Sequence, residues 1–554
     1  MLILVIVFSI ESVVAYGVPS FGVYEGARFS PTITVISSSE TAIRLSLSMD
    51  NLPPTTQELD IQAPFEGLVA NMLEPEEHPL IPRFTIFLAL PPSGNPTVTV
   101  ESWQTETYGV INPAFIPEND PSYPEVRLGD IQVLGGIRLV PLTIKPVEYV
   151  NNSASCTIMT DAVIQVNIDG SAGTLPQTSY PESFSIPWQR VLTSVVTNWE
   201  AIPDILNGAD SHLLIICPDE YLAVIQSFVD WKEQRGMTVT VVALSSISSS
   251  PSAIQIKQRI QSEFISSSPR IDYVLLVGDE SKIPPAYRFT EDPISRFSDY
   301  TYDDGSFTDE NHYAAIGDND DIDVFPEVFV GRWVVNNQSE VVSIANRSIF
   351  HERDVLLTEN QRFSQAALAA DFTEVTQAAT KRHCREMLLE RGFTRVDTLW
   401  AEPSPGPQNL VNWINEGVTF VNYRGSGWSF GWAGISFYLH TIANIANTGR
   451  LPIITAIGCG VGKYDVDDGQ CFGEAWMTQG TPSQPSGAVG FIGPCWNTHT
   501  VYNDCLDSSI YRAFLDYDVL NLGAALAAGK VYTWGLFEDF LNEDAVLELC
   551  RTMI

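Results

Sequence analysis

Residues 212–244 read HLLIICPDEYLAVIQSFVDWKEQRGMTVTVVAL, and this stretch decides the class of the fold. A short apolar run over 212–218 is typical of a buried strand. Residues 221–235 space their apolar side chains as an amphipathic helix does, and Gly236 follows as a stop signal. Residues 237–244 form a second strand pattern. Strand, helix and strand in this order predict a parallel sheet covered by helices.

The alternation continues on the C-terminal side of this stretch. A helix pattern over 252–266 and a strand pattern over 272–279 (DYVLLVGD) complete a β-α-β-α-β unit. A second set of strand patterns ends at FSQAALAAD (363–371), VTFVNY (418–423) and PIITAIG (452–458). We therefore expect an α/β region with mostly parallel sheets in two subdomains, over 205–355 and 356–554.

The residues before position 200 have a different texture. Runs such as TITVISS (32–38), RFTIFLAL (83–90) and AVIQVNI (162–168) are rich in β-branched or alternating apolar residues, and Pro, Gly, Asn and Asp separate them. This pattern predicts an all-β sandwich over 17–200.

The first 16 residues (MLILVIVFSIESVVAY) form an apolar run that contains small residues near its end. This composition predicts a signal peptide, and the run is shorter than the roughly 20 residues that a membrane-spanning helix needs. We therefore expect a secreted or cell-surface protein that is not an integral membrane protein. The formal net charge of -37 excludes nucleic acid as an expected partner, because phosphate binding requires clustered Lys and Arg.

Two turns that follow strand patterns carry the candidate chemistry. Ligands of open α/β sheets bind beyond the carboxyl ends of the strands, and Tyr423–Gly427 and Gly458–Cys459–Gly460 occupy such positions. Glycines beside Cys459 allow a sharp turn and leave backbone N–H groups for an oxyanion. The alternative is that Cys459 is a small buried apolar residue, as free cysteines usually are.

The ordered motifs of the chain resemble those of the gingipains, a caspase-like family of cysteine peptidases. In that family a Tyr-x-Gly-His-Gly motif supplies the catalytic histidine, and the turn after the next strand supplies the nucleophilic cysteine. Here Tyr423-Arg424-Gly425-Ser426-Gly427 and the segment 456–465 (AIGCGVGKYD) stand in the matching order. Residues 141–150 (PLTIKPVEYV) are similar to the late part of the gingipain propeptide.

The resemblance implies a secreted endopeptidase that is made with an N-terminal propeptide, acts on protein or peptide substrates and requires no cofactor. It makes Cys459 the nucleophile and, as an interpretation of the first motif, places Arg424 at the histidine position. A guanidinium releases no proton near neutral pH and offers no lone pair. The alternative is therefore a catalytically impaired pseudoprotease or a peptide-binding surface protein, unless His499 or His440 supplies the imidazole.

The resemblance implies roles for a few further residues. The Gly425 N–H is a candidate oxyanion donor, and Glu374 or Asp371 is a candidate for the acid that orients the histidine. Both acids are equally able to pair with Arg424. Trp428 and Trp496 are candidates for substrate binding, although core or rim positions suit these aromatic residues equally well. Gingipain-like domains bind calcium, and Asp318, Asp320 and Asp323 form an oxygen-rich loop of the kind that calcium prefers.

Overall fold

The computed structural model describes residues 13–14, 30–50, 52, 55, 84–109, 125–149, 155–170, 181–289, 306–317, 325–354, 361–371, 375–400, 406–466, 469–537, 550 and 553. The chain forms two compact units. The first comprises residues 1–132, 137–180 and 195–203, and the second comprises residues 133–136, 181–194 and 204–554.

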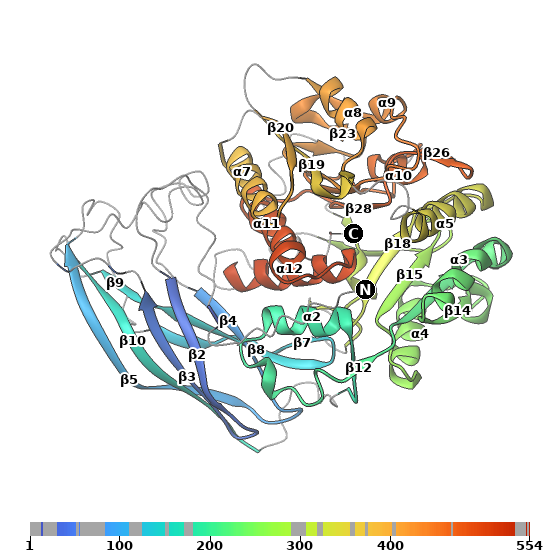
Figure 1. Ribbon diagram of the computed structural model, residues 1–554. Helices are drawn as coiled ribbons and strands as arrows, with labels where there is room; N and C mark the ends of the chain where they lie inside the picture. Colours follow the sequence, from blue (N-terminus) through green and yellow to red (C-terminus); the bar gives the residue numbers. More distant parts are fainter. Residues whose placement is uncertain are drawn as a thin grey trace, which may run out of the picture. The chain divides into compact units, whose positions relative to one another are not determined.

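The first unit is built from antiparallel strands in two sheets, one of six strands and one of four (Figure 1). Inward side chains of both sheets, among them Leu45, Leu88, Leu142 and Ile164, form one apolar core. The strands of the larger sheet are β1 (Val13–Val14), β2 (Ser30–Ser38), β3 (Ala42–Asp50), β10 (Ser155–Ile168), β5 (Pro96–Gly109) and β9 (Val147–Tyr149). Those of the smaller sheet are β4 (Phe84–Ala89), β8 (Ile137–Lys145), β6 (Glu125–Leu128) and β7 (Gln132–Leu134).

The second unit begins with a parallel four-stranded sheet that has helices on both faces. Leu213 and Ile215 of one strand pack into the core on one face, and Leu214 and Ile216 pack on the other. This alternation is expected of a strand that is buried on both sides. The strand order is β14 (Thr238–Ala243), β13 (His212–Cys217), β15 (Tyr273–Val277) and β18 (Phe329–Trp333), and the helices are α3 (Leu222–Gln234), α4 (Ala253–Ser266) and α5 (Gln338–Arg353). The strands and helices predicted over 212–279 are confirmed.

A second parallel sheet of five strands follows in the same unit. Its order puts β21 beside β25, and both strands were predicted from sequence. The strand order is β20 (Arg395–Leu399), β19 (Gln365–Ala370), β21 (Phe420–Arg424), β25 (Ile453–Ile457) and β28 (Gly490–Ile492). The helices are α7 (Val375–Glu390), α8 (Pro407–Glu416), α9 (Leu439–Ile442), α10 (Phe472–Thr478), α11 (Thr500–Asp516) and α12 (Leu522–Phe537).

Several shorter helices and strands complete the description. Three strands form a small antiparallel sheet just after β21: β22 (Gly427–Trp428), β23 (Gly431–Trp432) and β24 (Phe437–Tyr438). The others are α2 (Ile186–Val195), β11 (Phe184–Ser185), β12 (Gly208–Ala209), β16 (Ala286–Phe289), β17 (Ser306–Asp309), β26 (Gly480–Thr481) and β27 (Gln484–Pro485).

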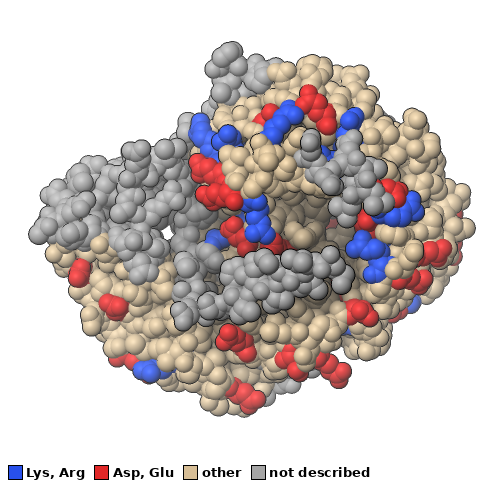
Figure 2. Space-filling view, in the orientation of Figure 1, with Lys and Arg blue, Asp and Glu red and all other residues tan. Residues whose placement is uncertain are grey.

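The surface agrees with the composition. Figure 2 shows Asp and Glu scattered among Lys and Arg over the visible face, in a chain of net charge -37. None of the helices that the structure describes is long and apolar enough to cross a bilayer. Apart from Val13 and Val14, the predicted signal peptide over 1–16 lies outside the described residues.

A buried polar network joins α7 and α11 to the second sheet. The Lys381 ammonium donates to Asp507 and to Asn422, and both charged side chains are fully buried. The Asn422 amide donates to Asp507 Oδ1 at 2.8 Å and to Thr455 Oγ1 at 2.7 Å. Burial raises the pKa of Asp507, and the ammonium of Lys381 opposes this shift. Such a network fixes the helices in one position, because each partner loses its hydrogen bonds if another moves.

Replacing Lys381 by Met is expected to lower the free energy of unfolding by about 3–5 kcal/mol, because it leaves the Asp507 carboxylate buried without a cation. Urea denaturation measures the change. Arg391→Met is the control, since the Arg391–Asp518 pair is exposed at 48% and 45% and such pairs contribute at most about 1 kcal/mol. Equal effects of the two variants would contradict the role given to the network.

Candidate active site

The candidate nucleophile lies at the carboxyl edge of the second sheet. Strand β25 ends at Ile457, and the turn that follows carries Cys459, which is partly exposed. Strands β21 and β25 run parallel, with Arg424 opposite Ile457. The two turns predicted from sequence therefore leave the same edge of the sheet side by side.

The two turns touch through their backbones, and glycine makes this approach feasible. A Cβ on Gly458 would lie 2.3 Å from the Gly425 carbonyl oxygen, and one on Gly427 would lie 2.9 Å from the Cys459 carbonyl oxygen. Cβ atoms essentially never come this close to backbone atoms. Gly460 adopts a φ of +61°, which is favourable for glycine. The glycines around Cys459 thus serve close packing of two loops as well as the turn.

The sulfur of Cys459 is bracketed by the backbone of Thr498. The Thr498 N–H donates to Sγ at 3.5 Å, and the thiol donates to the Thr498 carbonyl oxygen at 3.5 Å. Thr498 itself is held by Asn503 of α11, whose side-chain amide donates to Thr498 Oγ1 at 2.7 Å. The thiol therefore has a fixed position at the surface of the unit.

Cys459 differs from the other cysteines in its exposure. All eight cysteines are free thiols, and the other seven are buried. Burial raises the pKa of the thiols of Cys156, Cys217, Cys384, Cys471, Cys495 and Cys505. Because the thiolate is the nucleophile, these six are poor candidates for chemistry.

Arg424 is a buried structural residue. Its guanidinium donates from Nε to Asp504 Oδ1 at 2.7 Å and from Nη1 to the Ile457 carbonyl oxygen at 3.5 Å. The side chains of Arg424 and Asp504 are 2% and 7% exposed. The guanidinium thus ties the end of β21 to α11 and to the neighbouring strand.

The spacing of the motif also allows another residue than Arg424 to be aligned with the histidine. In Tyr-x-Gly-His-Gly, aligned on Tyr423, Gly425 and Gly427, the histidine falls on Ser426 and Arg424 occupies the variable position. The Ser426 side chain is exposed. Its carbonyl oxygen accepts from the Tyr423 hydroxyl at 2.8 Å and from the Ala433 N–H at 2.9 Å, which fixes the backbone.

The candidate oxyanion donors differ in their partners. The Gly425 N–H donates to the Ile457 carbonyl oxygen at 3.3 Å, so an oxyanion would compete with that bond. For the Cys459 N–H, no hydrogen-bond acceptor is found among the described residues. The Asp371 N–H donates to the Arg424 carbonyl oxygen at 3.0 Å, which places Asp371 beside this loop. Glu374, the other candidate acid, lies outside the described residues.

The tryptophans around the candidate site differ in how deeply they are buried. Trp428 is partly exposed in the hairpin that follows Ser426. Trp496 is only 4% exposed, and its ring packs against Phe307 at 6.1 Å between centroids, with the Lys463 ammonium 5.1 Å from its ring centroid. The Gly460 N–H donates to the Trp496 carbonyl oxygen at 2.9 Å, so Trp496 is a buried neighbour of the turn that carries Cys459. Trp432 is fully buried and stacks on Tyr423 at 4.7 Å.

Two histidines are the alternative sources of an imidazole. His499 follows Thr498 directly, is partly exposed and caps the start of α11 through its backbone position. Its ring lies 5.9 Å from that of Tyr502. His440 is exposed at the start of α9, with its ring 5.9 Å from that of Tyr438. His499 is thus the histidine closest in sequence to a residue that contacts the sulfur.

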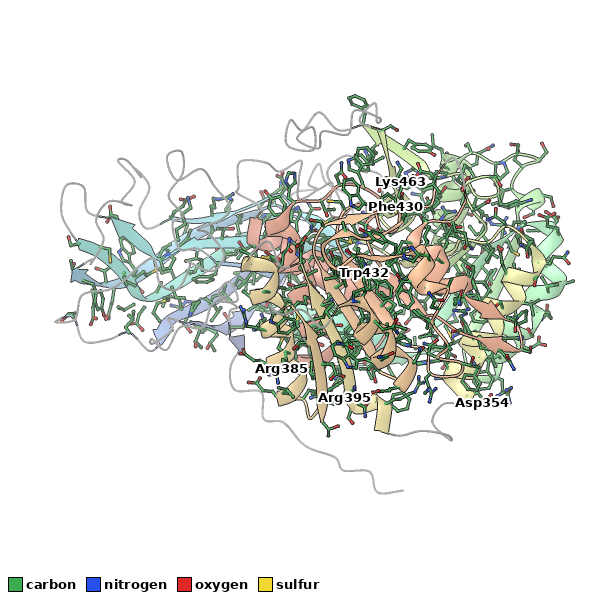
Figure 3. All side chains as sticks on the ribbon, turned by 90° about the horizontal axis from the view of Figure 1, so that it is seen from above. Asp354, Arg385, Arg395, Phe430, Trp432 and Lys463 are labelled. Carbon is green, nitrogen blue, oxygen red and sulfur yellow. The ribbon has the colours of Figure 1, made fainter. Side chains whose placement is uncertain are left out.

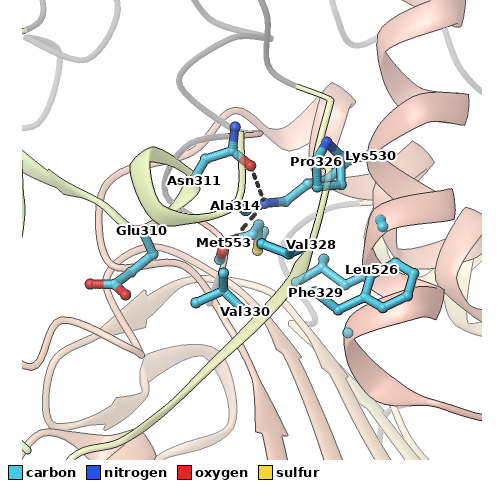
Figure 4. Close-up of a pocket in the computed structure, with 12 residues that line it drawn as sticks. Glu310, Asn311, Ala314, Pro326, Val328, Phe329, Val330, Leu526, Lys530 and Met553 are labelled. Atoms are coloured by element: carbon cyan, nitrogen blue, oxygen red, sulfur yellow. Dashed lines mark hydrogen bonds between the residues drawn. The ribbon is translucent and has the colours of Figure 1, made fainter. Parts of the chain in front are cut away.

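The predicted calcium site is not covered by the described residues. Among them no group of three His, Cys, Asp or Glu side chains could hold a metal ion, and the predicted calcium ligands Asp318, Asp320 and Asp323 lie outside them. A cavity of about 30 Å³ lies between α12 and β18, where Lys530 Nζ donates to Asn311 Oδ1 at 3.3 Å and to the Met553 carbonyl oxygen at 3.5 Å (Figure 4). This volume holds a water molecule but no peptide.

Helix α10 begins shortly after the nucleophile loop with a reciprocal cap. The Cys471 N–H donates to Glu474 Oε2 at 2.6 Å, and the Glu474 N–H donates to Cys471 Sγ at 3.4 Å. Burial raises the pKa of Glu474 to about 7, and the nearby carboxylates of Glu280 and Asp279 add to the shift. The Tyr464 hydroxyl in the preceding loop donates to Glu310, and Arg332 of β18 lies over the Tyr464 ring at 4.7 Å. The loop between Cys459 and α10 is therefore anchored beside β18 of the parallel four-stranded sheet.

Sequence reasoning missed Asp504 and Ser426. Asp504 has no sequence signal of its own, because its role depends on where α11 packs. Ser426 had one, since the fixed glycines of the motif mark its position.

The comparisons with known proteins identify the family of the chain. The family model for peptidase family C25 matches residues 207–553. Gingipain R2 from Porphyromonas gingivalis is 25% identical over 502 residues, which cover 84% of this chain and 65% of that protein. Lys-gingipain from the same organism is 21% identical over 459 residues, covering 76% of this chain and 25% of that protein. The chain therefore spans less than two thirds of the length of these relatives.

Solved structures show the same fold. The crystal structure of the Arg-specific cysteine proteinase gingipain R covers 62% of this chain with a TM-score of 0.53 at 22% identity, and 76% of that chain is matched. The complex of Porphyromonas gingivalis RgpB pro- and mature domains gives the same TM-score of 0.53 at 23% identity, with 62% and 77% covered. The caspase-like fold expected from the resemblance is supported by these neighbours.

Glu474→Gln is expected to change how stability depends on pH. Folding favours the protonated Glu474, so the unfolded state loses this proton near pH 4.5 and the folded state near pH 7. The unfolding free energy of the wild type should therefore fall, relative to that of the variant, as pH rises through this window, by at most about 1.4 kcal/mol per pH unit. Denaturant titrations at several pH values measure the difference, and a constant difference would contradict it.

Proposed function

We propose, because the chain belongs to peptidase family C25, that Cys459 is the nucleophile of a cysteine-type endopeptidase with slow turnover. The observation that carries this proposal is the partly exposed Cys459 thiol, which the touching glycine turns hold at the carboxyl edge of the sheet. The Cys459 thiolate would attack the carbonyl carbon of a peptide that binds at this edge of the sheet. The Cys459 N–H is available to the resulting oxyanion.

The second step of the reaction, release of the amine, is the step that we expect to be slow in this chain. The leaving amine needs a proton, and an imidazole at position 426 would supply it in the family motif. Ser426 has no group that titrates near neutral pH, and the guanidinium of Arg424 is held by Asp504. General acid catalysis contributes roughly 10²–10⁴ in rate. We therefore expect acylation of Cys459 to be slow and turnover to be slower than in a relative that keeps the histidine.

A second candidate function follows from the same observation. A family member without the imidazole can bind peptides without cleaving them, as a pseudoprotease or surface protein. His499 is the alternative imidazole source, since the backbone of its neighbour Thr498 contacts the sulfur. Loss of residual activity in His499→Ala would identify that source.

The proposal includes the remaining features expected from the resemblance. We assign the first unit the role of a propeptide-like domain and place the protein outside the cytoplasm. The likeness to gingipain R2 covers 84% of this chain, more than residues 207–553, so it reaches into the part before residue 207. Proteins and peptides are the substrates that a family C25 peptidase implies.

A thiol-reactive probe should label Cys459 in the folded chain well before any other cysteine, because the other seven are buried. Mass spectrometry of the digested protein measures the site and rate of labelling. Slow peptide cleavage that disappears in Cys459→Ala supports the enzyme, and labelling without cleavage supports the silent relative. Labelling of another cysteine first would overturn the assignment of the nucleophile.

Two substitutions to histidine test whether an imidazole restores catalysis at position 426 or at position 424. Ser426→His places an imidazole on an exposed side chain and is expected to raise the peptide cleavage rate by about 10²–10⁴ with little change in the melting temperature. Arg424→His leaves Asp504 without its guanidinium and should lower the unfolding free energy by about 3–5 kcal/mol without a gain in rate. A gain in rate from Arg424→His alone would contradict the assignment.

A further inference from the structure

A row of three partly exposed aromatic rings follows the Ser426 turn. We call Trp428, Phe430 and Tyr438 the aromatic strip. The rings of Trp428 and Phe430 are parallel within 4°, with centroids 6.2 Å apart, and Phe430 and Tyr438 are 6.0 Å apart. Phe430 is 50% exposed, and the other two are partly exposed. Adjoining apolar rings at the surface are unfavourable in water and often mark a binding surface.

The strip is fixed to the segment that carries the nucleophile. The Ser429 carbonyl oxygen, between two members of the strip, accepts from the Phe472 N–H at 2.7 Å. A Cβ on Gly460 would lie 3.9 Å from the Ser429 nitrogen. Phe430 lies in the hairpin that follows Ser426, and Lys463 lies in the loop that follows Cys459; both are labelled in Figure 3. The strip is thus attached to the backbone next to Cys459.

The backbone below the strip is rigid. Strands β22, β23 and β24 pair Trp428 with Gly431 and Gly431 with Tyr438. At Gly431 a Cβ would lie 2.4 Å from the Phe437 carbonyl oxygen, so the hairpin is closely packed. Trp432 anchors the hairpin in the core. Rings presented on such a support lose little conformational entropy when a ligand binds.

We propose that the aromatic strip binds an apolar, preferably aromatic, side chain of the peptide whose carbonyl faces Cys459. This inference rests on the proposed function and names its substrate class. The three members of the strip carry no charge, so a Lys or Arg side chain would give up hydration there and gain no carboxylate from the strip. An aromatic side chain would instead stack on the Phe430 ring and remove apolar surface of both partners from water.

The test compares peptidyl acyloxymethyl ketones that differ in one residue, Phe, Ala or Arg, next to the reactive group. The Cys459 thiolate attacks the methylene carbon, an S–C bond forms and the carboxylate leaves. We expect the Phe probe to label the full chain about 10–200 times faster than the Ala probe. Trp428→Ala and Phe430→Ala should each lower this ratio at least tenfold, while the rate with iodoacetamide stays unchanged.

Two controls make the outcomes distinguishable. Trp103→Ala removes a 49% exposed tryptophan of the first unit and should leave the ratio unchanged. The same three peptides without a reactive group, competing against a fluorescent peptide on Cys459→Ala, test binding without chemistry. If iodoacetamide does not label Cys459, the proposed function is overturned. The peptide competition still tests whether the strip binds aromatic side chains.

The proposal on the strip fails if Phe and Ala peptides bind and label equally, or if the strip variants leave the preference intact. It also fails if the Arg probe is the fastest. A concentration-dependent dimer that Phe430→Ala abolishes, without any peptide preference, would assign the strip to self-association instead.

Discussion

The site depends on the close contact between the backbones of two turns, one at Gly425–Gly427 and the other at Gly458–Gly460. Parallel pairing of β21 with β25 brings these turns together, and only glycine leaves room for the carbonyl oxygens between them. The position of the Cys459 thiol is thus set by backbone packing. The Ser426 side chain is exposed, so a change of this side chain leaves the packing of the two turns and the position of the Cys459 thiol intact.

Helix α11 links this edge of the sheet to the interior through three polar residues in its first turns. Asn503 holds Thr498, Asp504 holds Arg424, and Asp507 accepts from Lys381. Asp504 and Asp507 are three residues apart and therefore lie on one face of the helix. Buried ion pairs add little net stability, but removing one partner is costly, so they enforce one arrangement. The charge of Arg424 therefore serves the architecture around the thiol and takes no part in proton transfer.

The sequence was sufficient for the strands of the second sheet, because runs such as 418–423 and 452–458 have a clear pattern, but it did not predict the order of all five strands. It was insufficient for contacts between distant segments. Arg424 pairs with a residue 80 positions later, and no local pattern encodes the packing angle of a helix. Trp428 and Trp496 looked equivalent in sequence, yet one lies at the rim and the other is 4% exposed. Burial of an aromatic residue follows from its neighbours in space, which spacing alone does not give.

The contacts of the Cys459 sulfur bear on what an imidazole would add under the proposed function. As a thiol, Cys459 both donates to and accepts from the backbone of Thr498. On the proposed function, a cationic imidazole near the sulfur would stabilise the thiolate and supply the proton for the leaving amine. If no imidazole, that of His499 included, reaches the sulfur, the chain retains a well-placed thiol without this general acid.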